Sequence, residues 1–328
     1  MKEALLYEKN DIRIIDVPKP TIGPTEVLLK VMAAKICPTD IRKYNLGSND
    51  ARIRSLPMNL CHEYTGELVE VGNDVKDLKE GMRVTGYGFK GNAQYVKLET
   101  QSSNPYFRNA ILELPSNVSY EEGSFVTPLS ECIHSVVDQA KLRFGETIVI
   151  IGSGHMGIQQ ANIAHWCGAY VIVVDLVDER LEVAKSLGAD EVINGSKTDV
   201  VKQVKELTRG DMANCAIATL GSPVVIQSAI NVVGHNGRVV LFGGSPANTI
   251  MRFDPNDIHY SEKSLIGIEG IGVGDNRHAE RRPQALRHIA SGKINVNKLI
   301  TKIMPMTDIV AAYEMIKNGE ALTIVLNP

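Results

Sequence analysis

Short runs of alternating apolar and polar residues fill the first hundred positions of the chain, with glycine, proline and aspartate between them. Alternation with a period of two is typical of strands that bury one face. The clearest of these runs lie at 27–36, 66–72, 82–88 and 93–99. The pattern therefore predicts a β-rich region at the start of the chain.

From about residue 123 the pattern changes to continuous apolar runs that alternate with amphipathic segments. Continuous runs are typical of parallel strands that are buried on both faces. Such strands are expected at 146–152, 170–175, 191–195, 214–221, 237–244 and 263–270. Helices are expected between them, at 156–168, 179–190, 199–210 and 222–233. Strict alternation of strand and helix predicts an α/β fold with a doubly wound parallel sheet.

The pattern changes a third time after residue 275. Two helices and a final strand are expected there, at 281–293, 307–319 and 322–328. The parallel α/β region, 124–274, therefore looks inserted between two parts of a β-rich domain, 1–123 and 275–328. The segment 100–114 fits no regular element, and we expect it to line the substrate site.

The amino-acid composition excludes several classes of protein. The chain has 328 residues, of which 44% are hydrophobic and 22% charged, which suits one large or two medium globular domains. Its formal charge of −3 provides no basic field for nucleic acid or an anionic membrane. No apolar run reaches signal-peptide length at the N-terminus or the roughly 20 residues of a membrane helix. Five widely spaced cysteines do not suggest a disulfide framework, so a reduced cytoplasmic protein is expected.

A glycine-rich loop stands between the first buried strand of the α/β region and the helix that follows. It reads GSGHMG and contains Gly152, Gly154, His155, Met156 and Gly157. Gly152 would make the tight turn, Gly154 would let the backbone approach a pyrophosphate, and Gly157 would allow close packing of helix and strand. The free N–H groups of the helix N-terminus would then face the phosphates. We assign no separate role to the side chains of His155 and Met156.

An acidic residue, Asp175, ends the second buried strand, 18 residues beyond Gly157. A carboxylate there accepts hydrogen bonds from a ribose 2′-hydroxyl and repels a 2′-phosphate, which favours NAD over NADP. Arg180 could instead meet that phosphate. In the alternative interpretation, the glycines form a turn without a ligand and Asp175 only caps the next helix.

Several short motifs follow one another along nearly the whole chain. They are ICPTD (36–40), CHEYTGELVEVG (61–72), GMRV (81–84), NAQYV (92–96), TPLSECIHS (127–135), the glycine loop, and the ending from ALRHIASGK (285–293) through MIKNGEA (315–321). In their order and spacing the chain resembles the zinc-dependent medium-chain alcohol and polyol dehydrogenases, of the sorbitol and threonine dehydrogenase type. The resemblance implies a Rossmann NAD-binding domain inserted in a GroES-like catalytic domain. It also implies hydride transfer between the nicotinamide and a secondary alcohol of a polyol, sugar or cyclitol, in a homodimer or homotetramer.

The resemblance further implies a catalytic zinc site. Cys37 and His62 match the cysteine and histidine ligands of the family, and a thiolate with a neutral imidazole suits a tetrahedral zinc with one open position. Glu63 is implied either as a direct ligand or as a carboxylate that swings in during turnover. Asp40 would orient the imidazole, and Thr39 would relay the substrate proton.

The chain departs from the family pattern at several positions. Thr127 replaces the third protein ligand, so that either Glu63 or Glu131, one helical turn further on, completes the site. Cys61 replaces the usual glycine before the histidine, where it packs, oxidises or competes as a ligand. Segment 87–96 runs straight through the place of the four-cysteine structural zinc lobe. One catalytic zinc and no structural zinc are therefore expected.

Two residues in the segment 35–44 are weaker candidates for substrate binding. Arg42 stands where the family often carries a relay histidine, and an arginine there suits an anionic or hydroxyl-rich substrate. Tyr44 follows two positions later. The alternative for Arg42 is an ordinary solvated charge.

The residues leave other functions open. A lone cysteine in an apolar context is usually a buried core thiol, which is the plain alternative for Cys37. Loss of the third ligand at Thr127 motivates a zinc-free reductase of carbonyl or enone substrates. Because a fold does not fix a function, a non-enzymatic nucleotide-binding protein is a further alternative.

Overall fold

The computed structural model describes residues 1–50, 52–88, 90–101, 110–246, 248–268 and 277–328. The chain forms two compact units, which are unit 1, Met1–Ser130 with Val273–Pro328, and unit 2, Glu131–Gly272. Part of the irregular segment 100–114 and the end of the strand expected at 263–270 lie outside the described residues. None of the helices in the described ranges combines the length and the apolar character that a membrane span needs.

Unit 1 is built on a mixed sheet of seven strands and a separate two-stranded ribbon. Its strands are β1 (Lys2–Glu8), β2 (Asp11–Asp16), β3 (Glu26–Lys35), β4 (Glu63–Val71), β5 (Arg83–Tyr87), β6 (Tyr95–Glu99), β7 (Leu112–Glu113), β14 (Lys302–Pro305) and β15 (Ile324–Asn327). The order in the large sheet is β14-β15-β3-β4-β5-β7, and β6 pairs with β3. The β-rich region predicted from the alternating pattern is confirmed.

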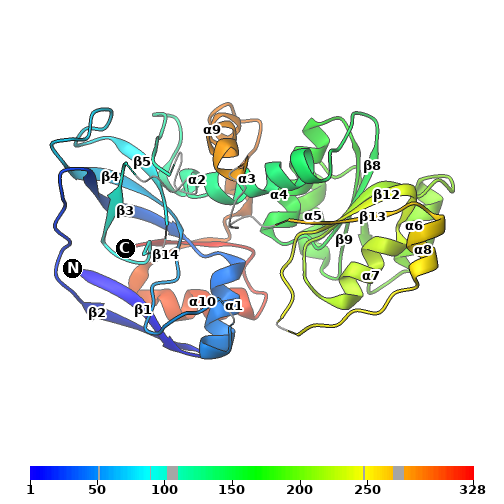
Figure 1. The fold of residues 1–328 in the computed structure, drawn as a ribbon, viewed down its shortest axis with the longest axis horizontal. Coiled ribbons are helices and arrows are strands. Elements are labelled where there is room, and N and C mark those ends of the chain that lie inside the picture. The colour runs from blue at the N-terminus through cyan, green and yellow to red at the C-terminus, as the bar shows by residue number, and fades with distance from the viewer. Residues whose placement is uncertain (51, 89, 102–109, 247, 269–276) are drawn as a thin grey trace. The chain divides into compact units, whose positions relative to one another are not determined.

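The helices of unit 1 cover this sheet and its ends. They are α1 (Pro38–Leu46), α2 (Tyr120–Gly123), α9 (Arg277–Ala290) and α10 (Ile309–Lys317), with the 3-10 turns η1 (Gly47–Asn49), η4 (Val296–Leu299) and η5 (Met306–Asp308). Helix α3 (Val126–Ile133) crosses from unit 1 into unit 2. Helices α1 and α10 lie side by side (Figure 1), although about 270 residues separate them in the chain.

The ends of β3 and β4 decide where the polar residues of unit 1 meet. These strands pair antiparallel, with Ala34 opposite Tyr64 in the register. The next pair of positions, Lys35 and Glu63, therefore stands at the end of the same ladder. Because α1 begins only three residues after β3 ends, Cys37 is brought to this edge of the sheet as well.

Unit 2 is a parallel sheet of six strands in the order β10-β9-β8-β11-β12-β13. The strands are β8 (Thr147–Ile151), β9 (Tyr170–Asp175), β10 (Glu191–Asn194), β11 (Ala213–Ala218), β12 (Val233–Leu241) and β13 (Ser264–Gly267). The helices are the π-helix η3 (His134–Gln139), α4 (His155–Trp166), α5 (Asp178–Ser186), α6 (Val200–Leu207), α7 (Pro223–Asn231) and α8 (Pro255–Tyr260). Figure 1 shows helices on both sides of this sheet. The first strand lies in the middle and the chain winds outward in both directions, which confirms the doubly wound fold.

Helices α1, α2 and α8 were not expected from the sequence pattern. Helix α1 has no strong apolar stripe, and its N-cap, Cys37, is not one of the residues that usually cap a helix. Pro38 at the first helical position and Asp40 in the first turn supply the start signal instead. Strand β4 also begins at Glu63, three residues before the predicted run at 66–72. The differences at α1 and β4 bring chemically active residues into regular elements.

Candidate metal and cofactor sites

Cys37 lies between the end of β3 and the first residue of α1, where it is the N-cap. Its backbone N–H donates a hydrogen bond of 3.1 Å to Oδ2 of Asp40. Pro38 has no N–H to leave without a partner at this helix start. The thiol is buried, with 7% of the residue exposed. The start of α1 therefore fixes the backbone that carries the sulfur.

Asp40 also contacts His62. Its second oxygen, Oδ1, lies 3.5 Å from Nδ1 of the imidazole, and both side chains are buried. On the other side of the ring, Nε2 lies 3.8 Å from Oε1 of Glu63. A carboxylate beside Nδ1 favours the tautomer that carries its proton there, so that Nε2 is the nitrogen that would bind a metal. Asp40 thus holds both the backbone of Cys37 and the ring of His62.

Cys37, His62 and Glu63 together form a group of potential metal ligands. Their ligand atoms all lie within 4.8 Å of one another, and all three residues are buried. Across the described ranges, no other group of three such side chains meets this condition. Sulfur, nitrogen and oxygen donors in this number suit a tetrahedral zinc with one open position. The chemistry of the donors therefore fits the ion that the sequence predicts.

In the absence of a metal, the buried ligands favour protonation. Burial, followed by the charge of Glu63, raises the pKa of the Cys37 thiol. For His62, burial disfavours the charged ring, but the charges of Asp40 and Cys37 outweigh burial and the pKa of His62 lies well above its usual value. A metal would displace these protons on binding, as thiolate and imidazole ligands require.

Lys35 belongs to the same site, although sequence reasoning missed it. Its Nζ lies 2.5 Å from Oε2 of Glu63, and the two side chains are 0% and 1% exposed. The ring of Phe125 lies 5.2 Å from the same nitrogen. Burial disfavours the ammonium, but the charges of Glu63 and Cys37 outweigh burial and raise the pKa of Lys35. A lysine at the end of a strand is usually a solvated charge. Only the register between β3 and β4 could have indicated that Lys35 lies beside Glu63.

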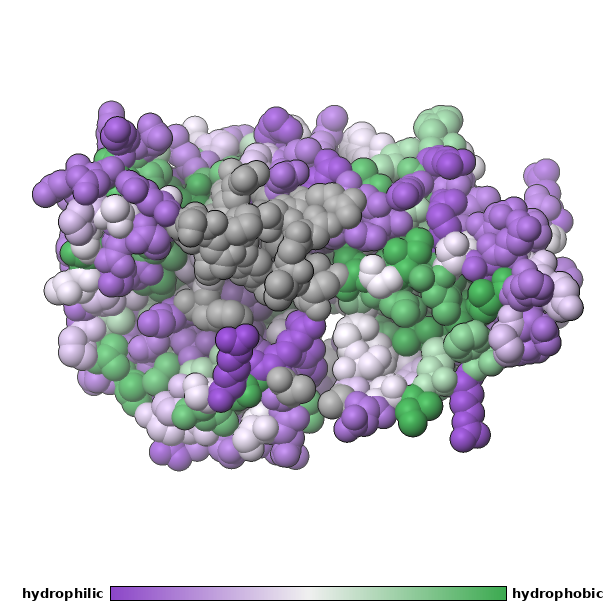
Figure 2. Space-filling model, viewed as in Figure 1, coloured by the Kyte–Doolittle hydropathy of each residue, from purple (hydrophilic) through white to green (hydrophobic). Residues whose placement is uncertain are grey.

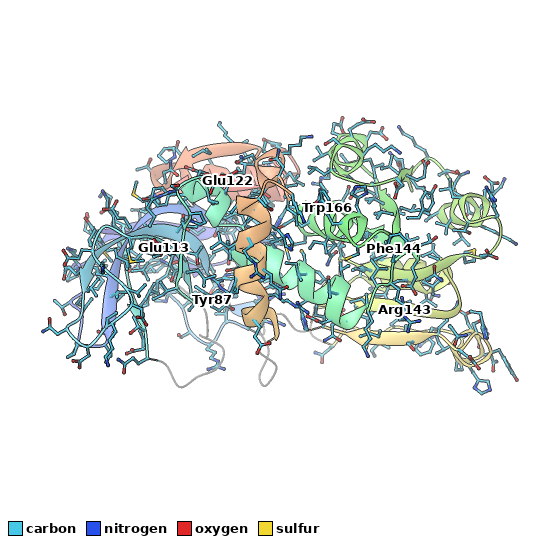
Figure 3. All side chains as sticks on the ribbon, turned by 90° about the horizontal axis from the view of Figure 1, so that it is seen from above. Tyr87, Glu113, Glu122, Arg143, Phe144 and Trp166 are labelled. Carbon is cyan, nitrogen blue, oxygen red and sulfur yellow. The ribbon has the colours of Figure 1, made fainter. Side chains whose placement is uncertain are left out.

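Thr127, which replaces the third ligand of the family, is engaged by a buried arginine. Nη1 of Arg282 on α9 donates a hydrogen bond to Oγ1 of Thr127. Nη2 donates to Oγ1 of Thr85 at 3.1 Å and to the carbonyl oxygen of Ala110 at 3.2 Å. The guanidinium also lies 5.0 Å from the centre of the Tyr87 ring, which Figure 3 labels near α9. A cation 155 residues away in the chain therefore contacts the hydroxyl that stands in place of the third ligand of the family.

Two further residues that were weighed as ligands lie outside the group. Cys61 is buried, and its sulfur lies 3.5 Å from the carbonyl oxygen of Glu63. Of the three roles open to Cys61, the structure therefore places it in the packing beside the strand ends. Glu131 belongs to unit 2, is half-buried and is not among the grouped ligands.

The remaining candidates on α1 point to different partners. Thr39 is half-buried in the first turn of the helix, two positions after Cys37. Nε of Arg42 donates a hydrogen bond of 2.7 Å to Oδ2 of Asp50, so this arginine has a buried carboxylate as a partner. The hydroxyl of Tyr44 lies 2.8 Å from a carboxylate oxygen on α10. Substrate contacts by Arg42 and Tyr44 stay predictions.

The glycine loop of unit 2 has the geometry of a phosphate-binding turn. Gly152 has a φ of +108°, a conformation that favours glycine, and a Cβ on Gly157 would collide with the carbonyl oxygen of Gly152. Gly154 is the N-cap of α4, and a Cβ there would meet nothing within 4 Å. Open space beside a helix N-terminus is what a pyrophosphate requires. The loop therefore fits a dinucleotide.

Asp175 connects this loop to the start of α5. Its Oδ2 accepts a hydrogen bond of 2.6 Å from the N–H of Ser153 in the loop. Its Oδ1 accepts from the N–H groups of Leu176 and Val177, at 2.7 and 3.1 Å. Asp175 thus caps the turn before α5 and also touches the loop. Oδ2, which accepts one hydrogen bond, can accept a second, and a contact with the ribose stays a prediction.

The other residues predicted around the cofactor lie on α4 and α5. His155 begins α4 and is buried, with its Nδ1 3.3 Å from the amide nitrogen of Gln159. The carbonyl oxygen of Met156 lies 3.5 Å from the sulfur of Cys132, so the backbone at this position packs within unit 2. Arg180 is half-buried on α5, five residues after Asp175. Roles for these three residues toward the cofactor stay predictions.

Comparison with known proteins identifies the family of both parts of the chain. The family model described as alcohol dehydrogenase GroES-like domain matches residues 23–132, and the one described as zinc-binding dehydrogenase matches residues 152–291. Sorbitol dehydrogenase of Bacillus subtilis (strain 168) is 31% identical, over 92% of this chain and 89% of that protein. Sorbitol dehydrogenase 2 of Saccharomyces cerevisiae is 32% identical, over 99% and 98%.

The fold is shared with solved structures as well. The crystal structure of 2R,3R-butanediol dehydrogenase from Bacillus subtilis superposes with a TM-score of 0.86 at 27% identity, and the match covers 100% of this chain and 99% of that one. Similarity over the full length of both proteins includes the region of the metal ligands and the region of the glycine loop. The chain therefore belongs to the zinc-type medium-chain alcohol dehydrogenase family.

Proposed function

We propose that this chain is a zinc- and NAD-dependent dehydrogenase that transfers a hydride between a secondary alcohol and the nicotinamide. The observation that carries the proposal is the buried group of Cys37, His62 and Glu63, whose donor atoms lie within 4.8 Å of one another. The matched relatives include sorbitol and butanediol dehydrogenases, which favours a polyol, or a related sugar or cyclitol, as the substrate class.

One zinc ion per chain would be held by Cys37, His62 and Glu63, and no structural zinc is expected. When bound, zinc supplies a Lewis acid that lowers the pKa of the alcohol. Asp40 lies 3.5 Å from Nδ1 of His62 and would orient the ring so that Nε2 faces the metal. The hydroxyl of Thr39 both accepts and donates hydrogen bonds, and we assign it the relay of the substrate proton toward water.

NAD would bind at the glycine loop of unit 2. The open space beside Gly154, at the N-terminus of α4, supports a pyrophosphate there. The negative charge of Asp175 supports NAD over NADP, because it repels a 2′-phosphate. Replacing Asp175 with serine should therefore raise the ratio of kcat/KM for NADP to kcat/KM for NAD. An unchanged ratio would remove Asp175 from cofactor selection.

Unit 1 would carry the metal and the substrate, and unit 2 the cofactor.

We further infer a homodimer or homotetramer, because β13 is an edge strand with Leu265 38% exposed. Hydrophobic side chains gather on this face of unit 2 around β13 (Figure 2). Among the described residues no disulfide joins any of the five cysteines, which supports a reducing compartment such as the cytoplasm.

Metal content of protein purified without added zinc or chelator tests the central claim. Wild-type protein should contain about one zinc per chain, and a Cys37→Ala, His62→Ala double variant should contain none. The wild type should then oxidise members of a polyol and cyclitol panel with NAD. Zinc content that survives in the double variant would place the metal elsewhere.

A zinc-free reductase of carbonyl or enone substrates is the second candidate. The observation that favours it is the contact between Thr127 and Arg282, which engages the hydroxyl in the position of the third ligand of the family. In that case wild-type protein would take up no zinc on soaking, and a chelator would leave reduction of an enone unchanged. The presence of all three residues Cys37, His62 and Glu63 supports the zinc-dependent function instead.

A further inference from the structure

The two oxygens of the Glu63 carboxylate face different partners. Oε1 lies 3.8 Å from Nε2 of His62, on the side of the grouped ligands. Oε2 lies 2.5 Å from Nζ of Lys35, on the opposite side of the carboxylate. One oxygen is thus available to a metal while the other is neutralised by an ammonium. A carboxylate divided in this way can bind a metal through a single oxygen.

Backbone structure holds Lys35 in this position. Lys35 is the last residue of β3 and Glu63 is the first residue of β4, and these strands are paired immediately beside them through Ala34 and Tyr64. The ammonium is fully buried and lies 5.2 Å from the ring of Phe125. A cation with no access to water stays with the nearest carboxylate. The pair therefore limits rotation of the Glu63 side chain.

Thr127 is a weaker candidate than Glu63 for the third metal ligand. Its hydroxyl accepts a hydrogen bond from Arg282, which is 1% exposed and also binds Thr85 and Ala110. The oxygen of a threonine hydroxyl that already accepts a hydrogen bond from a guanidinium is a poor ligand for a second cation. Among Glu63 and Thr127, only Glu63 combines a negative charge with a place in the ligand group.

We propose that Lys35 is a positioning residue that fixes Glu63 as a permanent third ligand of the metal, in place of the ligand lost at Thr127. Of the two roles open to Glu63, direct ligand or swinging carboxylate, this selects the first. The inference rests on the metal-dependent function proposed above. It concerns how this chain holds its ion, and it does not depend on which alcohol is oxidised.

Zinc affinity of Lys35→Met, measured by competition with a chromophoric chelator, tests the proposal. We expect the dissociation constant for zinc to rise about 10- to 100-fold, the usual effect of losing a group that orients a metal ligand. Lys35→Arg keeps a cation and should show a smaller loss. Lys97→Met is the matched control, because Lys97 pairs with Glu26 at 2.9 Å on the surface of the same sheet, and its zinc affinity should equal that of the wild type.

Cobalt substitution supplies a readout that does not depend on activity. In Lys35→Met the thiolate-to-cobalt absorption should persist, because Cys37 still binds, while the d–d bands should change because Glu63 is no longer fixed. If Lys35→Met does not fold, as judged by circular dichroism, Lys35→Gln replaces it with the same expectations. Zinc binding as tight as in the wild type, with unchanged cobalt bands, would overturn the role of Lys35. A wild type that binds no zinc would instead refute the proposed function.

Discussion

The hydroxyl of Tyr44 on α1 donates a 2.8 Å hydrogen bond to the carboxylate of Glu314 on α10, across 270 positions of the chain. The ring of Tyr44 also meets the ring of Tyr313 edge to face, with centroids 5.2 Å apart. These contacts join the helix that begins at Cys37 to a helix from the C-terminal part of unit 1. The thiol of the metal site is therefore supported by residues from both ends of the chain.

Replacing Tyr44 with phenylalanine should remove this hydrogen bond and keep the ring contact. We expect the free energy of unfolding to fall by about 1 kcal/mol, the usual net contribution of one hydrogen bond. Urea denaturation measures this change. KM for the alcohol should stay as in the wild type. A raised KM without loss of stability would instead return Tyr44 to the substrate site.

Acidification should weaken the contact between Arg42 and Asp50. Burial raises the pKa of Asp50, but the hydrogen bonds from Arg42 and from the N–H of Arg52 outweigh burial, so the pKa lies below its usual value. A carboxyl with a lowered folded-state pKa stabilises the fold above its unfolded pKa of about 4 and loses this contribution as the pH falls through the lowered value.

An Asp50→Asn variant tests this linkage. The variant should be less stable than the wild type at pH 7, by about 1–2 kcal/mol, and the difference should shrink toward pH 3. Urea denaturation across this pH range gives both curves. A difference that stays constant with pH would show that the ionisation of Asp50 does not contribute.

Substitution by alanine at two glycines of the loop should affect two different properties, NAD binding and thermal stability. A Cβ at Gly154 meets nothing in the chain, so Gly154→Ala should fold normally and bind NAD at least about tenfold more weakly, because the methyl group enters the space for the pyrophosphate. A Cβ at Gly157 collides with the carbonyl oxygen of Gly152, so Gly157→Ala should lower the melting temperature. NAD titration and thermal denaturation separate the two effects. Equal NAD affinity in Gly154→Ala and the wild type would move the phosphates away from this loop.

Removal of the metal should affect the two units differently. A chelator should lower alcohol oxidation about a hundredfold or more, because Lewis-acid stabilisation is worth several kcal/mol. NAD binding should persist, since the glycine loop and Asp175 belong to unit 2. Added zinc should restore turnover. Dehydrogenation that continues at full rate in the metal-free protein would contradict the zinc mechanism.

The sequence was sufficient to predict the parallel sheet and the ligand candidates but not the cations around them. Continuous apolar runs such as 146–152 become buried strands because their period leaves no polar face. The positions of Lys35 and Arg282 depend on the strand register and on a contact between residues 155 positions apart, which local patterns do not contain. Helix α1 was not predicted because it lacks a strong apolar stripe and because its N-cap, Cys37, is an unusual capping residue. The hydrogen bond from the backbone of Cys37 to Asp40, which stabilises its start, cannot be seen in the sequence pattern.

The place of Lys35 and Glu63 at the end of one antiparallel ladder makes the metal site a reporter of folding. Side chains alternate between the two faces of a strand, so a register error of one residue between β3 and β4 would turn one member of the pair to the opposite face. A misregistered chain could retain much of its secondary structure and yet lack the assembled ligands. Recovery of tight zinc binding after denaturation would then time the moment at which this ladder reaches its native alignment.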